Sequence, residues 1–221
     1  MEFKRIKLAP WVCLAVLVVA CSHPAGAKPA PSGAANVTPE SLPADAQILE
    51  QLEADLDTDG KAEQVAVFQQ GRKLVLRVAP FRVAPYGGEG KPWSKPLPEG
   101  ATFTSLSVKD VNADRNGEVL LEVRGPEPSS HSLWVIRWAA GQGEVLPPLR
   151  GPLAGSEYFR SKYYPPLTED LDGNNTYEIV VAADKGDPHF LDSLVYEWGP
   201  EGYALSDLYF MPPRLVPTAT P

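Results

Sequence analysis

Short apolar, β-branched runs separated by turn residues follow one another along the chain from about residue 46 to residue 210. Their length and spacing are typical of β-strands, and the helical period is weak throughout. In the middle of the chain the expected strands lie near 103–109, 118–124, 132–139 and 143–147. The segment 46–52 fits either a strand or a short helix. We therefore predict an all-β domain over 46–210.

Three acidic segments divide this domain into repeated units. The first acidic loop is 55–63, the middle acidic loop is 110–118 and the third acidic loop is 170–178. Each has oxygen-bearing side chains at positions 1, 3, 5 and 9 and is followed by an apolar run. Trp138 and Trp198 stand at the same offset from the second and third segments, and we expect both to pack between units. A fixed period indicates a repeat architecture, so we predict three similar units of four antiparallel strands.

The pattern D-x-[DN]-x-[DN]-x-x-x-E followed by an apolar run resembles the FG-GAP/VCBS repeats, which form the blades of integrin-like β-propellers. The resemblance covers the whole of 46–210. It implies propeller-like blades, calcium in the acidic loops, and a role in binding or adhesion rather than a particular reaction. Propellers usually have about 4–8 blades, and three are counted here. We therefore expect a partial or open propeller, a propeller with a degenerate unit, or one that a partner completes.

The acidic loops are candidate calcium sites. Calcium takes six to eight oxygen ligands at about 2.3–2.6 Å, and an EF-hand would need its glutamate at position 12. That position holds Ala66, Leu121 and Val181, which excludes an EF-hand. We predict up to three structural Ca²⁺ ions, each relieving carboxylate repulsion and joining two strands. The candidate side-chain ligands are Asp55, Asp57, Asp59, Glu63, Asp110, Asn112, Asp114, Glu118, Asp170, Asp172, Asn174 and Glu178. Position 7 can add its backbone carbonyl, from Lys61, Asn116 or Thr176.

The three loops are not equivalent. The first has four carboxylates, with Gly60 at the sharp turn, where a positive φ costs glycine least. The third has three carboxylates and Asn175 at the turn, and asparagine tolerates this conformation. The middle loop has Arg115 there, which is unfavourable unless Gly117 relocates the bend. The expected calcium occupancy therefore falls from the first loop to the third and then to the middle one.

Composition and charge narrow the function classes. The 221 residues carry a formal net charge of −8, which argues against nucleic acid as the main partner. The three histidines have no zinc-like spacing, and neither a G-x-S-x-G elbow nor a glycine-rich phosphate loop is present. We therefore predict that the protein is not an enzyme.

The first 21 residues have the features of a targeting segment. Basic residues precede an apolar run over 11–20, which is too short for a membrane span of about 20 residues. Val18-Val19-Ala20-Cys21 resembles the lipobox of bacterial lipoproteins. That resemblance implies cleavage after residue 20 and acylation of Cys21, and Ser22 favours the outer membrane. The alternative is an ordinary secretory signal with a chance cysteine.

The expected organisation is a signal peptide over 1–20, lipidated Cys21 and a disordered tether to residue 45, the repeat domain over 46–210, and a Pro-rich tail over 211–221. We expect a calcium-stabilised binding or scaffolding lipoprotein of the bacterial envelope, held to the membrane by its lipid, with a protein or glycan partner. The alternatives are a glycan-acting enzyme on a β-repeat support and an accessory subunit of an outer-membrane complex. Tyr163 and Tyr164, an unrepeated aromatic pair, are the candidate partner surface.

Overall fold

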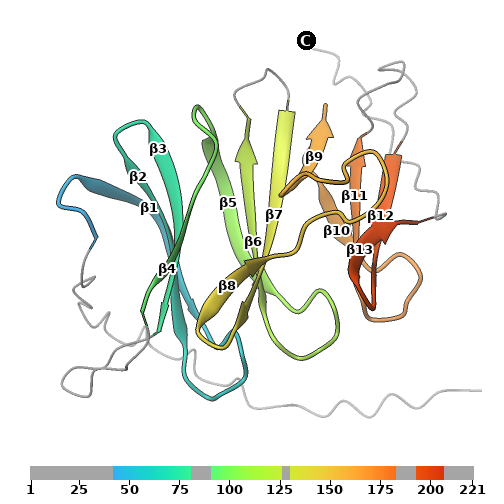
Figure 1. Cartoon of the computed structure of the whole chain (residues 1–221), viewed down its shortest axis with the longest axis horizontal. Coiled ribbons are helices and arrows are strands. Elements are labelled where there is room, and N and C mark those ends of the chain that lie inside the picture. The colour runs from blue at the N-terminus through green and yellow to red at the C-terminus, as the bar shows by residue number, and fades with distance from the viewer. Residues whose placement is uncertain (1–41, 81–90, 126–129, 183–192, 207–221) are drawn as a thin grey trace, which may run out of the picture. The chain divides into compact units, whose positions relative to one another are not determined.

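Every regular element of the described residues is a β-strand. The computed structural model describes residues 42–80, 91–125, 130–182 and 193–206 (Figure 1). The all-β prediction is confirmed for these residues, and the ambiguous segment 46–52 is a strand. Within the same ranges, no helix has the length and apolarity needed to cross a membrane. The signal peptide, Cys21, most of the tether and the tail lie outside the described residues.

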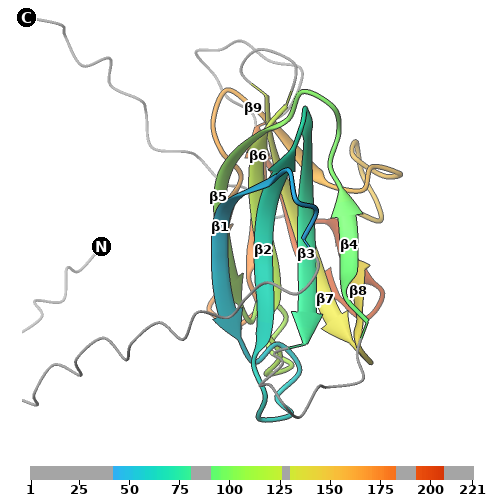
Figure 2. The ribbon, with the colours of Figure 1, turned by 90° about the vertical axis from the view of Figure 1, so that its left-hand side faces the viewer.

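The strands form three antiparallel sheets, in which neighbouring strands follow the order of the chain except that β9 pairs with β7. The first sheet contains β1 (Ala46–Ala54), β2 (Glu63–Gln70), β3 (Lys73–Pro80) and β4 (Trp93–Pro96) (Figure 2). The middle sheet contains β5 (Thr102–Lys109), β6 (Glu118–Arg124), β7 (Ser130–Ala139), β8 (Gln142–Val145) and β9 (Phe159–Lys162). The third sheet contains β10 (Leu167–Glu169), β11 (Glu178–Ala182), β12 (Ser193–Gly199) and β13 (Gly202–Leu205).

The prediction of four strands per unit is wrong for the middle sheet, which has a fifth strand. There β9 pairs antiparallel with β7, so that Leu133 lies opposite Phe159. Phe159 is fully buried and makes edge contacts with Tyr196 and Tyr203 of the third sheet. The extra strand therefore belongs to the middle sheet by its hydrogen bonds and reaches the third sheet by its side chain.

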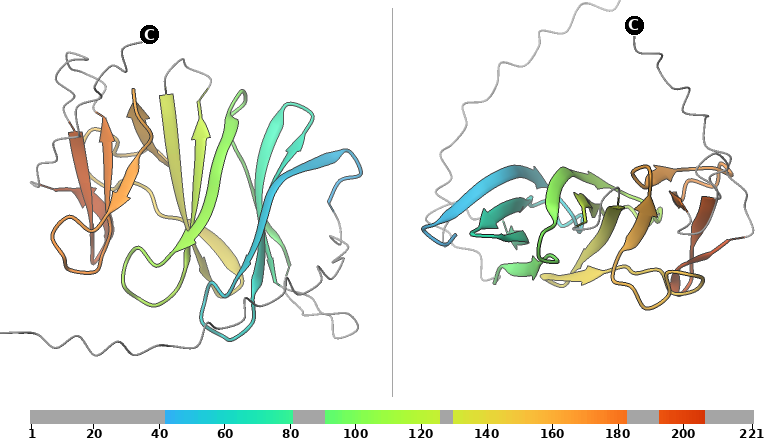
Figure 3. Two further views of the ribbon diagram at one scale, coloured as in Figure 1. Left: turned by 180° about the vertical axis from the view of Figure 1, so that it is seen from behind. Right: turned by 90° about the horizontal axis from the view of Figure 1, so that it is seen from above.

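The middle sheet is buried on both faces because it lies between the other two (Figures 1 and 3). Along β7, Trp134 and Ile136 enter a core shared with the first sheet, whereas Leu133 and Val135 enter a core shared with the third sheet. Successive side chains of a strand point to opposite faces, so a strand buried on both faces needs an unbroken apolar run. This explains the unbroken apolar run Leu133–Ile136 in β7.

The repeated tryptophans lie between sheets, as predicted. Trp138 is buried in the core between the first and middle sheets. Trp198 packs against the core between the middle and third sheets and makes an edge contact with Tyr203. Val83, at the corresponding offset in the first unit, lies outside the described residues.

Candidate metal centre

Each acidic loop connects the first two strands of its sheet, and its final glutamate is the first residue of the second strand. The loops thus join β1 to β2, β5 to β6, and β10 to β11. In all three, the glutamate at position 9 closes the hairpin as a cross-strand pair. The pairs are Ala54 with Glu63, Lys109 with Glu118, and Glu169 with Glu178. The spacing read from the sequence is therefore a repeated hairpin geometry.

The backbone adopts the left-handed conformation at positions 4 and 6 of every loop. The φ angles are 57° for Thr58, 61° for Ala113 and 76° for Gly173 at position 4, and 82° for Gly60, 76° for Arg115 and 69° for Asn175 at position 6. The middle loop therefore bends at Arg115 itself, and the suggestion that Gly117 relocates the bend is wrong. Gly117 has a different function, because a Cβ atom there would lie 2.6 Å from Cγ1 of Val108.

Carboxylates hold this backbone by accepting hydrogen bonds from its amides. The first residue of each loop accepts from the N–H at position 6, over 3.0 Å in Asp55, 3.0 Å in Asp110 and 3.1 Å in Asp170. The glutamate at position 9 accepts from the N–H at position 2, over 2.9 Å in Glu63, 3.1 Å in Glu118 and 2.7 Å in Glu178. These repeated bonds explain how Arg115 is held in a conformation that non-glycine residues seldom adopt.

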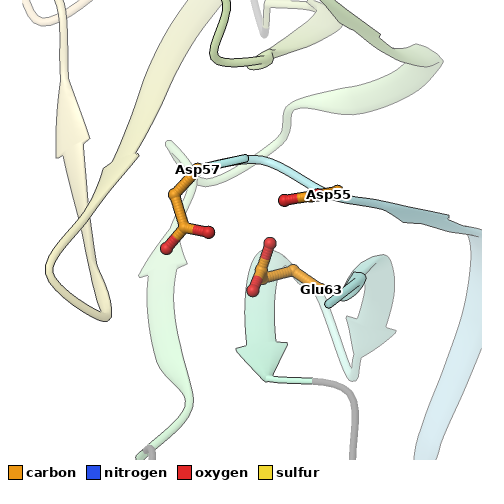
Figure 4. A group of neighbouring side chains, drawn as sticks. All are labelled: Asp55, Asp57 and Glu63. Carbon is orange, nitrogen blue, oxygen red and sulfur yellow. The ribbon is translucent and has the colours of Figure 1, made fainter. Parts of the chain in front are cut away.

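Two of the loops gather three carboxylates around one point. In the first loop these are Asp55, Asp57 and Glu63, each with an oxygen within 4.8 Å of the others. Figure 4 shows the three side chains turned towards one another. The third loop forms the matching group of Asp170, Asp172 and Glu178. Two oxygens on one calcium ion lie at most about 5 Å apart, so both groups have a spacing that fits calcium.

The middle loop forms no such carboxylate group, and Asn112 at position 3 explains the difference. Its Nδ2 donates to Glu118 Oε1 over 3.1 Å and to Asp114 Oδ2 over 3.2 Å. Asn112 is only 7% exposed, so its amide lies between the two carboxylates and away from solvent. A neutral donor thus takes the place between acidic side chains that a cation would need.

The middle and third loops each contain a buried carboxylate oxygen without a hydrogen-bond partner, Asp110 Oδ1 in the middle loop and Glu178 Oε1 in the third. Glu178 is 0% exposed, and its Oε2 accepts from the Leu171 amide. Its Oε1 is buried and has no hydrogen-bond partner. A buried carboxylate oxygen without a partner is costly, and a bound cation would satisfy it. Asn174 competes in part, because its Nδ2 donates to Asp172 over 3.0 Å.

Burial and mutual repulsion disturb the closing glutamates. Burial raises the pKa of Glu118 to about 7, a rise that the Val111 amide opposes and that Asp114 and Asp110 reinforce. The pKa values of Glu63 and Glu178 are also raised, chiefly by burial, with further contributions from the aspartates of their own loops. A bound cation would favour the ionised form of these carboxylates and so reverse the effect.

Backbone hydrogen bonds link each acidic loop to the next one. The Gly117 amide donates to the carbonyl of Leu56 over 3.1 Å, and the Tyr177 amide donates to the carbonyl of Val111 over 2.8 Å. Both acceptors stand at position 2 of their loops, and their side chains are fully buried in the core that follows. The conformation of a loop is therefore connected directly to the packing of neighbouring sheets.

Some predicted ligands lie apart from the carboxylate groups. Asp59 is absent from the group of the first loop, and instead it accepts from the Lys61 amide over 2.8 Å and pairs with the Lys61 ammonium over 3.4 Å. Asp114 and Asn174 occupy the same position and likewise accept from the amide two residues later. Position 5 therefore serves mainly to hold the loop backbone.

The spacing of the acidic residues does not reveal the bonds from position 9 to position 2 or the bridging role of Asn112. An asparagine at position 3 was counted as one more oxygen ligand, although its side chain also carries a donor. The Nδ2 donor of Asn112 is the feature of the sequence that indicates a middle loop stabilised by its own hydrogen bonds.

The predicted aromatic surface is partly tied to the fold. Tyr163 is exposed and has a φ of 79°, with the Lys162 ammonium 5.2 Å from its ring centroid. The Tyr164 hydroxyl is hydrogen-bonded to Ser193 Oγ over 3.0 Å, which ties this residue to β12. Tyr163 is thus the more accessible member of the pair, and a role in partner binding stays a prediction.

Comparison with family models gives no match, and a search of curated proteins finds no similar sequence.

Proposed function

We propose that the protein is a calcium-stabilised binding or scaffolding lipoprotein of the bacterial envelope. Two Ca²⁺ ions would be bound by the first and third acidic loops, and none by the middle loop. The observation that carries the proposal is the matching carboxylate group in the first and third loops.

The position of the loops supports a structural role for calcium. Each carboxylate group combines residues of a connection with the first residue of the next strand, so an ion there would fix a hairpin. The first loop also accepts a backbone bond from the middle loop through Leu56. Calcium in the first loop would therefore stabilise the packing of two sheets.

The three sheets serve, in this proposal, as blades of an open propeller. Their packing in a row through two cores supports this interpretation, and the repeated loop bonds give successive sheets the same relation. Such an assembly presents loops and sheet edges to a partner, either a protein or a glycan. The lipid on Cys21 would hold the domain at the membrane.

Calorimetric titration of the full chain in detergent tests the metal component. We expect saturable Ca²⁺ binding in the wild type and none in the double variant Asp57→Asn, Asp172→Asn, which keeps the side-chain shapes. Undiminished Ca²⁺ binding in the double variant would overturn the proposed sites.

The lipoprotein component is tested by the intact mass of the mature protein from a bacterial host, and an unmodified Cys21 would reject it.

A further inference from the structure

The glutamate that closes the middle acidic loop has a cation across the sheet. The pairing of β6 with β7 ends with Val119 opposite Ile136. Glu118 and Arg137, one residue further along each strand, therefore stand opposite one another. Residues directly opposite in an antiparallel pair have their side chains on the same face of the sheet. The Arg137 side chain thus lies on the face of the sheet that carries the fully buried Glu118.

The electrostatic environment of Arg137 agrees with this placement. The pKa of Arg137 is raised chiefly by its hydrogen bond with Glu144 on β8. Burial opposes this rise, and the negative charges of Glu144, Asp114 and Glu118 add to it. The Nη2 of Arg137 donates to Glu144, whereas its Nε is buried and has no hydrogen-bond partner among the described residues. The guanidinium is therefore close enough to feel two acids of the middle loop.

The corresponding position in the other two sheets holds no cation. In the first sheet the closing Glu63 is paired with Pro80, which carries no charge. In the third sheet the register of β11 on β12 places Glu197 opposite Glu178. The residue across from the closing glutamate is therefore neutral in the first sheet, positive in the middle sheet and negative in the third. The positive residue accompanies the one acidic loop that forms no group of three carboxylates among the described residues.

We propose that Arg137 is the built-in counter-ion of the middle acidic loop, where it takes the electrostatic role that calcium takes in the other two loops. The comparison with calcium rests on the proposed function. The middle loop contains Asp110, Asp114 and Glu118, and Asp110 has a buried oxygen without a hydrogen-bond partner among the described residues. A fixed guanidinium offsets the repulsion between these acids, and it repels a divalent cation that approaches them. Asn112 fills the space between the acids, and Arg137 lowers the affinity of that space for a cation.

Thermal unfolding of the full chain without calcium tests the counter-ion directly. In chelator at pH 8, we expect Arg137→Gln to lower the melting temperature by roughly 3 °C or more. Arg137→Lys keeps a positive charge and should recover at least half of this loss. Glu144→Gln is the control, because it breaks the partly exposed ion pair and leaves the guanidinium in place. Such pairs contribute little, so the control should stay within about 1 °C of the wild type. Equal losses in Arg137→Gln and Glu144→Gln, or no recovery in Arg137→Lys, would overturn the proposal.

Calcium affinity provides a second test. Asn112→Asp places a third carboxylate in the middle loop, and calorimetric titration measures the affinity for the added ion. Adding Arg137→Gln should tighten this affinity roughly tenfold, because a positive charge no longer repels the ion. Glu197→Arg puts a cation at the corresponding place in the third sheet and should weaken one of the two wild-type sites by a similar factor. Glu197→Gln, the matched neutral control, should weaken it less. Unchanged affinities in both charge-altering variants would overturn the proposal.

The two measurements distinguish the counter-ion from the proposed calcium sites. The wild type can bind no Ca²⁺ while its melting temperature in chelator still depends on the charge at position 137. That result would overturn the calcium sites and support the counter-ion. Two bound ions in the wild type, with Arg137→Gln no more harmful than Glu144→Gln, would support the calcium sites and overturn the counter-ion.

Discussion

The first and middle acidic loops have the same backbone and different chemistry. Both turn through left-handed residues at positions 4 and 6, and both close with a glutamate that accepts the position 2 amide. At position 3, however, the first loop has Asp57 and the middle loop has Asn112. Asp57 joins a group of three carboxylates, whereas the Asn112 amide donates to Glu118 and Asp114.

This difference separates the fold of the loop from its ability to bind metal. Amide-to-carboxylate hydrogen bonds hold the backbone in the same conformation in all three loops. The residue at position 3 decides whether the space between the carboxylates is suited to calcium or is filled by an amide. The loops therefore share one structural role, and only two of them fit a metal.

Removal of calcium should lower the melting temperature more than any of the other changes. The loss should come from the first and third acidic loops and not from the middle one. A ligand at a hundredfold excess over its Kd stabilises a folded protein by about 2.7 kcal/mol per site. Two sites then predict a fall in melting temperature of about 10 °C or more on chelation. Asp57→Asn and Asp172→Asn each place at position 3 the asparagine that the middle loop has there. Each variant should remove about half of the calcium-dependent difference in melting temperature.

Asp114→Asn in the middle loop is the control for this experiment. It alters an acidic loop of the same shape, and its cost should be the same with calcium and with chelator. A calcium-dependent loss in Asp114→Asn as large as that in Asp57→Asn would contradict the distinction between the loops.

The pH dependence of stability tests the environment of Glu118 in the middle loop. Glu118 holds its proton up to about pH 7 in the folded protein, compared with about pH 4.5 in the unfolded chain. The folded state therefore binds more protons in this interval, and stability falls as the pH rises through it, by at most about 3 kcal/mol. Urea unfolding in chelator should show this decline, and Glu118→Gln should remove most of it. A wild-type stability that rises from pH 5 to pH 7 would show that the sign is wrong.

The contact between the first and middle loops should be sensitive to one methyl group. In Gly117→Ala the new Cβ would lie 2.6 Å from Val108 and 3.6 Å from Leu56, beside the bond that joins the two loops. Overpacking of this kind costs about 1–3 kcal/mol. Ala62→Gly at the same position of the first loop is the matched control, and urea unfolding should show a clearly smaller loss for it. Equal losses of stability in the two variants would mean that the close approach of Gly117 to Val108 does not contribute to stability.

The sequence predicted the strands and loops well because both depend on local patterns. The spacing of the aspartates located all three hairpins, and short apolar runs located strands such as β6 and β7 to within about two residues. The strand β9 was missed because it is short and its pairing with β7 is set by the tertiary packing of Phe159. The left-handed Arg115 was misjudged, since the bond from its amide to Asp110 outweighs the backbone preference.

The candidate site was predictable in composition but not in detail. Counting oxygen atoms placed Asp57 and Asn112 in the same class, although one side chain carries a charge and the other a donor. Which carboxylates meet at one point depends on loop geometry, and for this reason Asp59 was expected as a ligand but lies outside the group. A spacing rule identifies the loop, and the atoms at position 3 decide its chemistry.

The most direct test is the number of Ca²⁺ ions bound by the wild type and by Asn112→Asp. Native mass spectrometry of the full chain, released from detergent in the gas phase, counts the ions directly. The wild type should bind two, Asp57→Asn should bind one, and Asn112→Asp should bind three, because a third carboxylate then replaces the bridging amide. Three ions in the wild type, or two in Asn112→Asp, would contradict the claim that position 3 determines which loops bind calcium.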